Sequence, residues 1–132
     1  MRVFKTKRLD RWAGKEGLAD KVLWQAALEV AAGNVEASLG QCLYKKRLAR
    51  PGEGKRSGLR TIVAFKSASG DRVFFVYGFA KNQQANITET ERHGLALVAK
   101  HFLDAAPDVI DNLLRAGELV EVIKETGHER HS

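Results

Sequence analysis

The sequence has few of the features that stabilise secreted or membrane proteins. Cys42 is the only cysteine among 132 residues, so no disulfide can form within one chain. No hydrophobic run approaches the roughly 18 to 20 residues that are needed to cross a bilayer. Residues 1–7 carry positive charge with no hydrophobic segment behind them, which argues against a signal peptide. We therefore expect a cytoplasmic protein that does not associate with membranes.

Motifs for metal ions and for nucleotide phosphates are also missing. No cluster of His, Cys, Asp and Glu has the spacing of a metal site. The glycine-rich run 51–58 lacks the Gly-Lys-Ser/Thr ending and the following helix of a phosphate-binding loop. Of the histidines, His93 and His101 fall on a predicted helix and the other two lie near the end of the chain, so we interpret all of them as solvent or packing residues. We expect neither a metal nor a cofactor.

What the sequence does have is an excess of positive charge. Lys and Arg number 22 against 16 Asp and Glu, which gives a net charge of +6. The segments 1–15 and 41–60 are strongly basic, whereas most acidic residues lie from Asp104 onward. Such clustering is typical of proteins that bind nucleic acid or an anionic surface, although a basic domain can also use net charge for solubility alone. The length of 132 residues predicts one compact domain, which we place at residues 1–124 with a polar tail at 125–132, and the 44% hydrophobic content is enough for a buried core.

Hydrophobic periodicity and turn residues predict a mixed α+β fold. Two N-terminal helices should pack on a mostly antiparallel, twisted sheet, with a helical segment near the C-terminus. Asp20 is the expected N-cap of the second helix, and Thr88 with Glu91 forms a capping-box pattern. The composition of 51–58 indicates a loop. The predicted strands cover 2–6, 43–50, 60–66, 72–81 and 119–123, and the predicted helices lie around 9–13, 20–32, 88–104 and 107–116.

Several short motifs follow one another in the predicted order strand–helix–helix–strands–helix. They are Val3-Phe4-Lys5-Thr6-Lys7 with Trp12-Ala13, Lys45-Lys46-Arg47, Arg50-Pro51-Gly52-Glu53-Gly54-Lys55, Gly58-Leu59-Arg60, and Phe74 to Asn82 continued by Ala85-Asn86-Ile87. Through the order and spacing of these motifs together, this small basic chain resembles the RelE/ParE toxin superfamily, in particular its HigB-like branch of RelE-type toxins. The resemblance covers about residues 1–124.

The resemblance implies a toxin of a type II toxin–antitoxin system. Such a protein is a ribosome-dependent endonuclease of messenger RNA, and a cognate antitoxin, expected as a helix-turn-helix protein from the adjacent gene, keeps it inactive. Two other functions remain open. A ParE-like inhibitor of DNA gyrase would share the fold without an active site. A plain nucleic-acid-binding module is less favoured, because the sequence shows no helix-turn-helix motif and no RNA-recognition aromatic pair.

Cations stand at the positions where a metal-independent RNase would need them. The 2′-hydroxyl must lose its proton and attack phosphorus, the phosphorane must be stabilised, and the leaving oxygen must be protonated. Arg60 is predicted to bind the phosphorane, because its planar guanidinium group can donate two hydrogen bonds to phosphate oxygens. Lys81 is expected to neutralise the leaving group. Lys45 or Lys46 is the candidate general base, and because neighbouring strand residues point to opposite faces, the sequence does not choose between them.

Four further residues are expected to bind RNA. Lys55 and Arg56 should grip the backbone from the glycine-rich loop, with Arg47 and Asn82 beside the catalytic cations. Each cation also has a purely structural interpretation. The Lys45-Lys46-Arg47 run can keep an edge strand from aggregating through its charge, Arg60 can form a structural ion pair, and Lys81 can simply begin a loop. Tyr77 is interpreted as a core residue.

Overall fold

The computed structural model describes residues 1–50, 52, 54–68 and 70–124, with the backbone alone described at 54–57. None of the helices in this part of the chain is both long and apolar enough to cross a membrane. The elements in chain order are β1 (Arg2–Thr6), α1 (Lys7–Lys15), α2 (Asp20–Ala31), β2 (Ala37–Gly40), β3 (Leu43–Arg50), β4 (Gly54–Phe65), β5 (Arg72–Ala80), α3 (Glu89–Asp104), α4 (Pro107–Arg115) and β6 (Leu119–Val122).

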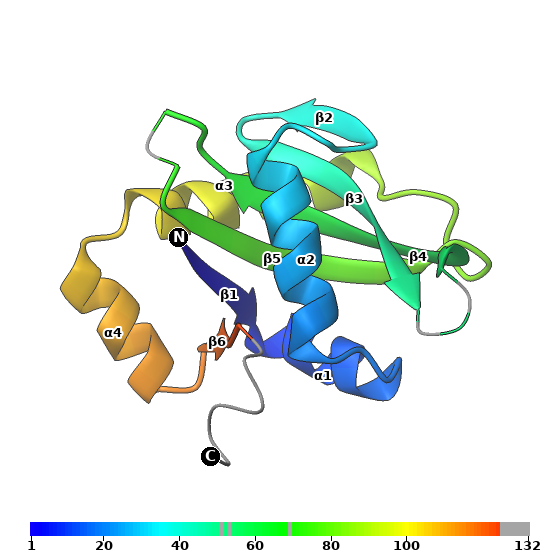
Figure 1. Ribbon diagram of the computed structural model, residues 1–132. Helices are drawn as coiled ribbons and strands as arrows, with labels where there is room; N and C mark the ends of the chain where they lie inside the picture. The colour runs from blue at the N-terminus through cyan, green and yellow to red at the C-terminus, as the bar shows by residue number, and fades with distance from the viewer. Residues whose placement is uncertain (51, 53, 69, 125–132) are drawn as a thin grey trace, which may run out of the picture.

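The strands form one twisted sheet in the order β2-β3-β4-β5-β1-β6 (Figure 1). β1 and β5 run parallel, and the other neighbouring pairs are antiparallel. β5 lies inside the sheet because it is hydrophobic on both faces, with Phe75 buried on one side and Phe74 on the other. The predicted α+β class and the mostly antiparallel sheet are confirmed.

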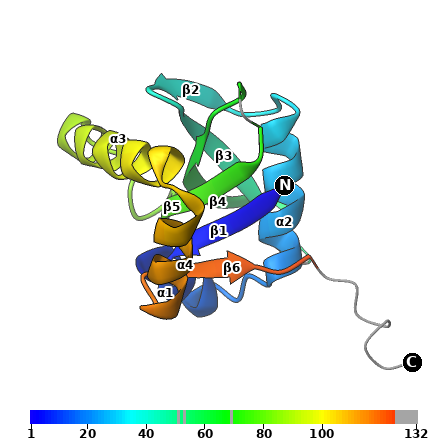
Figure 2. The same cartoon turned by 90° about the vertical axis from the view of Figure 1, so that its left-hand side faces the viewer.

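Helices cover both faces of the sheet (Figure 2). α1 and α2 bury Leu9 and Leu23 in the core on one face. α3 and α4 bury Phe102 and Ile110 on the other face, where the Phe102 ring stacks on Phe74 at a centroid distance of 5.1 Å. The two N-terminal helices and the C-terminal helical segment therefore lie on opposite sides, and the fold has three layers.

Side-chain capping explains where two of the four described helices begin. Oγ1 of Thr6 accepts the Leu9 N–H at 3.1 Å at the start of α1. Thr88 and Glu91 form the predicted capping box, with bonds of 3.0 and 2.8 Å. The prediction for Asp20 is wrong: Ala19 is the N-cap, and Asp20 is the first residue of α2. The Asp20 carboxylate is not available as a cap, because it accepts the N–H of Ile123 and an ammonium hydrogen from β1.

Two features of the sheet differ from the sequence prediction. β2 was not predicted, and it pairs with β3 through a tight turn in which Gln41 and Cys42 have positive φ angles of 54° and 63°. The predicted loop 51–58 is partly wrong, because β4 begins at Gly54 and continues the ladder with β3. Pro51, Glu53 and the predicted tail 125–132 lie outside the described residues.

Gly78 of β5 allows the Trp12 ring of α1 to lie directly on the sheet. A Cβ added at Gly78 would stand 2.3 Å from Trp12 Cε3, well inside van der Waals contact. We expect Gly78→Ala to lower the free energy of unfolding by about 1–3 kcal/mol, measured by urea denaturation, because the indole must move. Gly14→Ala is the control: a Cβ there meets nothing within 4 Å, and alanine favours the helix. Equal stability of Gly78→Ala and the wild type would contradict a tight contact.

Lys5 ties both N-terminal helices to β1. Its Nζ lies 2.8 Å from Oδ1 of Asp10 and 3.0 Å from Oδ1 of Asp20, and the side chain is 9% exposed. Burial alone would lower the pKa of Lys5, but the hydrogen bonds and charges of the two carboxylates outweigh it and hold the pKa above its ordinary value.

This raised pKa predicts a specific loss of stability at alkaline pH. The ion pairs contribute fully below the unfolded-state pKa of Lys5, about 10.4, and the contribution disappears as the pH rises through the folded-state value. Urea denaturation of the wild type and of Lys5→Met at pH 8 and above pH ~10.5 should show a difference in stability that shrinks at the higher pH. Lys15→Met, for an exposed lysine, is the control. A difference that stays constant with pH would exclude this role of Lys5.

Candidate functional site

A cluster of cations lies at one open end of the sheet, on the face that also carries α3. Lys45 and Arg47 come from β3, Arg60 comes from β4, and Lys81 directly follows β5. These side chains surround a cavity of ≈ 390 Å³, which Glu36 and Ala85 also line. We call the four cations and Glu36 the sheet-end cluster.

Strand pairing explains why these residues meet. Arg47 lies opposite Arg60, and Arg60 lies opposite Phe79 of β5. Side chains two positions apart on a strand share a face, so Lys45 joins Arg47 and Lys81 follows Phe79. Strand pairing therefore brings four of the predicted site residues, Lys45, Arg47, Arg60 and Lys81, to one face of the sheet.

Lys46 does not belong to this cluster, which corrects its assignment as a catalytic candidate. It points to the opposite face, beneath α2, and has no exposed surface. Its Nζ lies 2.6 Å from Oε1 of Glu29 and donates to the Asn34 carbonyl at 2.9 Å. A lysine enclosed in this way holds α2 on the sheet and does not reach an external substrate.

The backbone fixes the side chains of the cluster in several ways. The Lys81 N–H donates to the Gly58 carbonyl at 2.8 Å, so the turn after β5 is attached to β4. Gly58 has a φ of 82°, a conformation that favours glycine. Nη1 of Arg60 donates to the Leu59 carbonyl at 3.3 Å, and its other guanidinium donors have no partner among the described residues. Nε of Arg47 is buried and has no hydrogen-bond partner in the described part of the chain.

Glu36 is the functional candidate that the sequence analysis missed. It lies between α2 and β2, and its N–H donates to the Lys45 carbonyl at 2.9 Å. Its Oε1 accepts the backbone N–H of Arg47. No pattern in the sequence distinguishes Glu36 from other acidic residues, because only the pairing with β3 brings its carboxylate beside the cations.

The other predicted RNA-binding residues are Asn82, Lys55 and Arg56. Asn82 is exposed in the turn that begins at Lys81. Lys55 and Arg56 belong to β4 and not to a loop, and their side chains lie outside the description. His93 and His101 are exposed on α3. Within residues 1–50, 52, 54–68 and 70–124, no three His, Cys, Asp or Glu side chains are placed to hold a metal ion.

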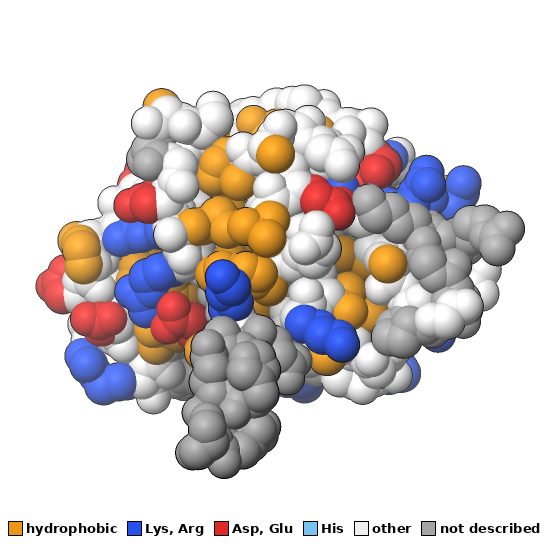
Figure 3. Space-filling model, in the orientation of Figure 1, with side chains coloured by type: hydrophobic (Ala, Val, Ile, Leu, Met, Phe, Trp, Pro, Cys, Tyr) orange, Lys and Arg blue, Asp and Glu red, His pale blue; other side chains and the backbone are white. Residues whose placement is uncertain are grey.

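The cluster is also distinguished by its charge. Lys5, Lys46 and Arg50 each have a carboxylate partner. Lys45, Arg47, Arg60 and Lys81 have none in an ion pair among the described residues. On the face that carries α2, hydrophobic side chains gather near the middle and basic side chains are dispersed (Figure 3). Four cations with a single carboxylate in one cavity attract a polyanion, and Arg and Lys are the usual partners of phosphate.

Comparison with known proteins agrees with the resemblance found in the sequence. No curated protein sequence matches the chain. A family model described as the RelE toxin of the RelE/RelB toxin–antitoxin system matches residues 1–122, which include every helix and strand described above. The chain therefore belongs to the RelE toxin family and is the toxin component of a toxin–antitoxin system.

Proposed function

We propose that this toxin is an endoribonuclease that cuts messenger RNA on the ribosome and thereby stops translation. The observation that carries the proposal is the sheet-end cluster, in which four cations and one carboxylate line one open cavity. Phosphoryl transfer within RNA needs a base, stabilisation of the phosphorane and protonation of the leaving oxygen. The cluster offers a group of suitable type for each task.

Glu36 is the proposed general base. Oε1 accepts the Arg47 N–H, which orients the carboxylate, and Oε2 takes the proton from the 2′-hydroxyl. The 2′-oxygen then forms a bond to phosphorus, and the bond from phosphorus to the 5′-oxygen breaks. The products are a 2′,3′-cyclic phosphate and a 5′-hydroxyl. Glu36 replaces Lys45 in this role, because the hydrogen bond from the Arg47 N–H orients its carboxylate beside the cavity.

The cations have complementary roles in this proposal. Arg60 donates two hydrogen bonds to the non-bridging oxygens, whose negative charge increases in the transition state. Lys81 donates a proton to the departing 5′-oxygen. Lys45 adds positive charge to the cavity, while Arg47 and Asn82 hold the neighbouring RNA backbone. Lys55 and Arg56 remain proposed RNA-binding residues on the strength of their charge and position in β4.

We further propose that the cognate antitoxin neutralises this surface. The cations that line the cavity favour an acidic segment of the partner, which would exclude RNA by occupying the same cavity. An antitoxin encoded by an adjacent gene should therefore restore growth when it is co-expressed with the toxin in the cytoplasm. Rescue by an antitoxin that does not bind this chain would contradict the idea.

Induced expression in a bacterial host tests the function directly. Translation should stop, and primer extension should map cuts in translated messages at the ribosomal A site, with 2′,3′-cyclic phosphate ends. DNA supercoiling should remain normal. A variant with Arg60→Ala that is folded by circular dichroism should give far fewer cuts. Intact transcripts together with accumulated gyrase-cleaved DNA would instead establish the gyrase-inhibitor function.

A further inference from the structure

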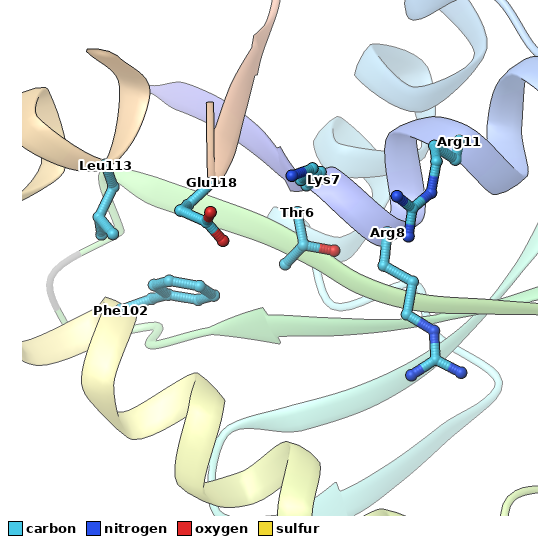
Figure 4. A pocket seen from close by; sticks show the side chains of 7 residues that line it. All are labelled: Thr6, Lys7, Arg8, Arg11, Phe102, Leu113 and Glu118. Carbon is cyan, nitrogen blue, oxygen red and sulfur yellow. The ribbon is translucent and has the colours of Figure 1, made fainter. Parts of the chain in front are cut away.

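A second basic pocket lies where β1 passes into α1 (Figure 4). Its volume is ≈ 430 Å³. The cations Lys7, Arg8 and Arg11 of α1 line one side, and Phe102, Leu113 and Glu118 line the other. We call the three cations the α1 cluster.

The α1 cluster is short of negative charge. None of its three side chains forms an ion pair among the residues that the structure describes, and Glu118 is the only acidic residue lining the pocket. Other cations of the same N-terminal region are neutralised, since Lys5 contacts both Asp10 and Asp20. Uncompensated cations that converge on an open pocket repel one another, and an external anion relieves that repulsion.

The α1 cluster opens on the same sheet face as the sheet-end cluster. The Arg8 guanidinium carbon lies 5.4 Å from the centroid of the Tyr77 ring in β5. Tyr77 and Phe79 share a face, with ring centroids 6.0 Å apart, and Lys81 is the next residue on that face. From Tyr77 to Lys81 the strand extends about 13 Å, at roughly 3.3 Å per residue. An extended RNA strand is long enough to contact both clusters at once.

The chemistry of the α1 cluster matches a phosphodiester backbone. Arg8 and Arg11 each present a planar fork that donates two hydrogen bonds to phosphate oxygens. Thr6, which borders the pocket, accepts the Leu9 N–H with its Oγ1 and still has its own hydroxyl proton to donate. Phe102 and Leu113 supply an apolar wall for a sugar or a base.

We infer that the α1 cluster is a second RNA-phosphate site, which holds RNA while the sheet-end cluster cuts it. This inference rests on the proposed function, because it takes the cut strand to be RNA bound at the sheet-end cluster. The phosphates come either from the message beside the cut or from ribosomal RNA. The chemistry is the same in both cases, and the experiment below separates the two sources.

The first measurement is binding of the purified chain to a non-cleavable RNA oligonucleotide with a 2′-O-methyl group at the cut position. Arg8→Gln/Arg11→Gln should raise Kd about ten-fold, the size expected when charge-assisted contacts to phosphate are lost. The dependence of log K on log salt should become shallower by about 1.4, since each phosphate contact on a single strand contributes about 0.7. Lys15→Gln/Lys21→Gln, which removes the same charge elsewhere, is the control and should change Kd much less.

Trimming the oligonucleotide locates the contact. If the α1 cluster binds the message, removing nucleotides from one end should weaken wild-type binding and abolish the difference in Kd between wild type and variant. Removing nucleotides from the other end should leave that difference in Kd unchanged. In a second arm, the same variants bind to ribosomes without message. A loss in this arm with no loss for the oligonucleotide assigns the phosphates to ribosomal RNA.

The inference is overturned if the Arg8→Gln/Arg11→Gln variant and the Lys15→Gln/Lys21→Gln control bind equally in both arms. If the folded wild type binds RNA through the α1 cluster but does not cut translated messages, the inferred RNA-phosphate site stands and only the proposed nuclease function is refuted. Failure of one idea is therefore distinguishable from failure of the other.

Discussion

Arg60→Ala is expected to slow the cleavage of ribosome-bound message about 10²–10³-fold under single-turnover conditions, the usual cost of losing one preorganised charge-stabilising donor. Arg60 lies in the centre of the sheet-end cluster, opposite both Arg47 and Phe79. Its charge is most valuable when the phosphorane forms, so the loss should fall mainly on the rate of cutting. Binding to ribosomes should change far less, because other cations also contribute to it.

The conservative variant Arg60→Lys makes this expectation sharper. It preserves the charge but not the planar fork, so it should recover only part of the activity. Lys15→Ala removes a cation outside both clusters and serves as the control for a general change in net charge. If a folded Arg60→Ala protein cuts at the wild-type rate, Arg60 is not in the reaction site, and Lys45 and Lys81 become the residues to test.

The fold could be predicted largely because hydrophobic periodicity and capping patterns agree over most of the chain. The Thr88–Glu91 capping box and the central place of β5 both follow from local rules that tertiary packing did not override. β2 escaped prediction because four residues are too few to establish an alternating pattern and its turn has Gln41 and Cys42 where glycine or asparagine is usual. Asp20 was assigned wrongly because a long-range ion pair took precedence over helix capping.

For the candidate site, the sequence predicts only which residues of a strand share a face of the sheet, through the alternation (parity) of side chains along the strand. Parity shows that Lys45 and Lys46 point to opposite faces, but not which face α2 covers. The decisive contact is the one between Lys46 and Glu29, whose position in the interface depends on how the helix packs. Glu36 could not be found at all, because its role depends on the register between the chain before β2 and the edge of β3.

Glu36→Gln should lower the cleavage rate about 10²–10⁴-fold, the range that general-base catalysis contributes. The substitution suits the structure, because the glutamine amide oxygen can still accept the Arg47 N–H and the side chain keeps its length. RNA binding should be unchanged or slightly tighter, since one negative charge leaves a cavity lined by four cations.

Glu36→Gln separates a base from a merely structural carboxylate, because the amide can keep the hydrogen bond to the Arg47 N–H but cannot take a proton from the 2′-hydroxyl. Asp108→Asn, which removes an exposed carboxylate on α4, is the matched control and should keep the wild-type rate. A Glu36→Gln protein that cuts at the wild-type rate would remove Glu36 from the mechanism. The proton of the 2′-hydroxyl would then have to pass to Lys45, the other candidate base that lines the cavity.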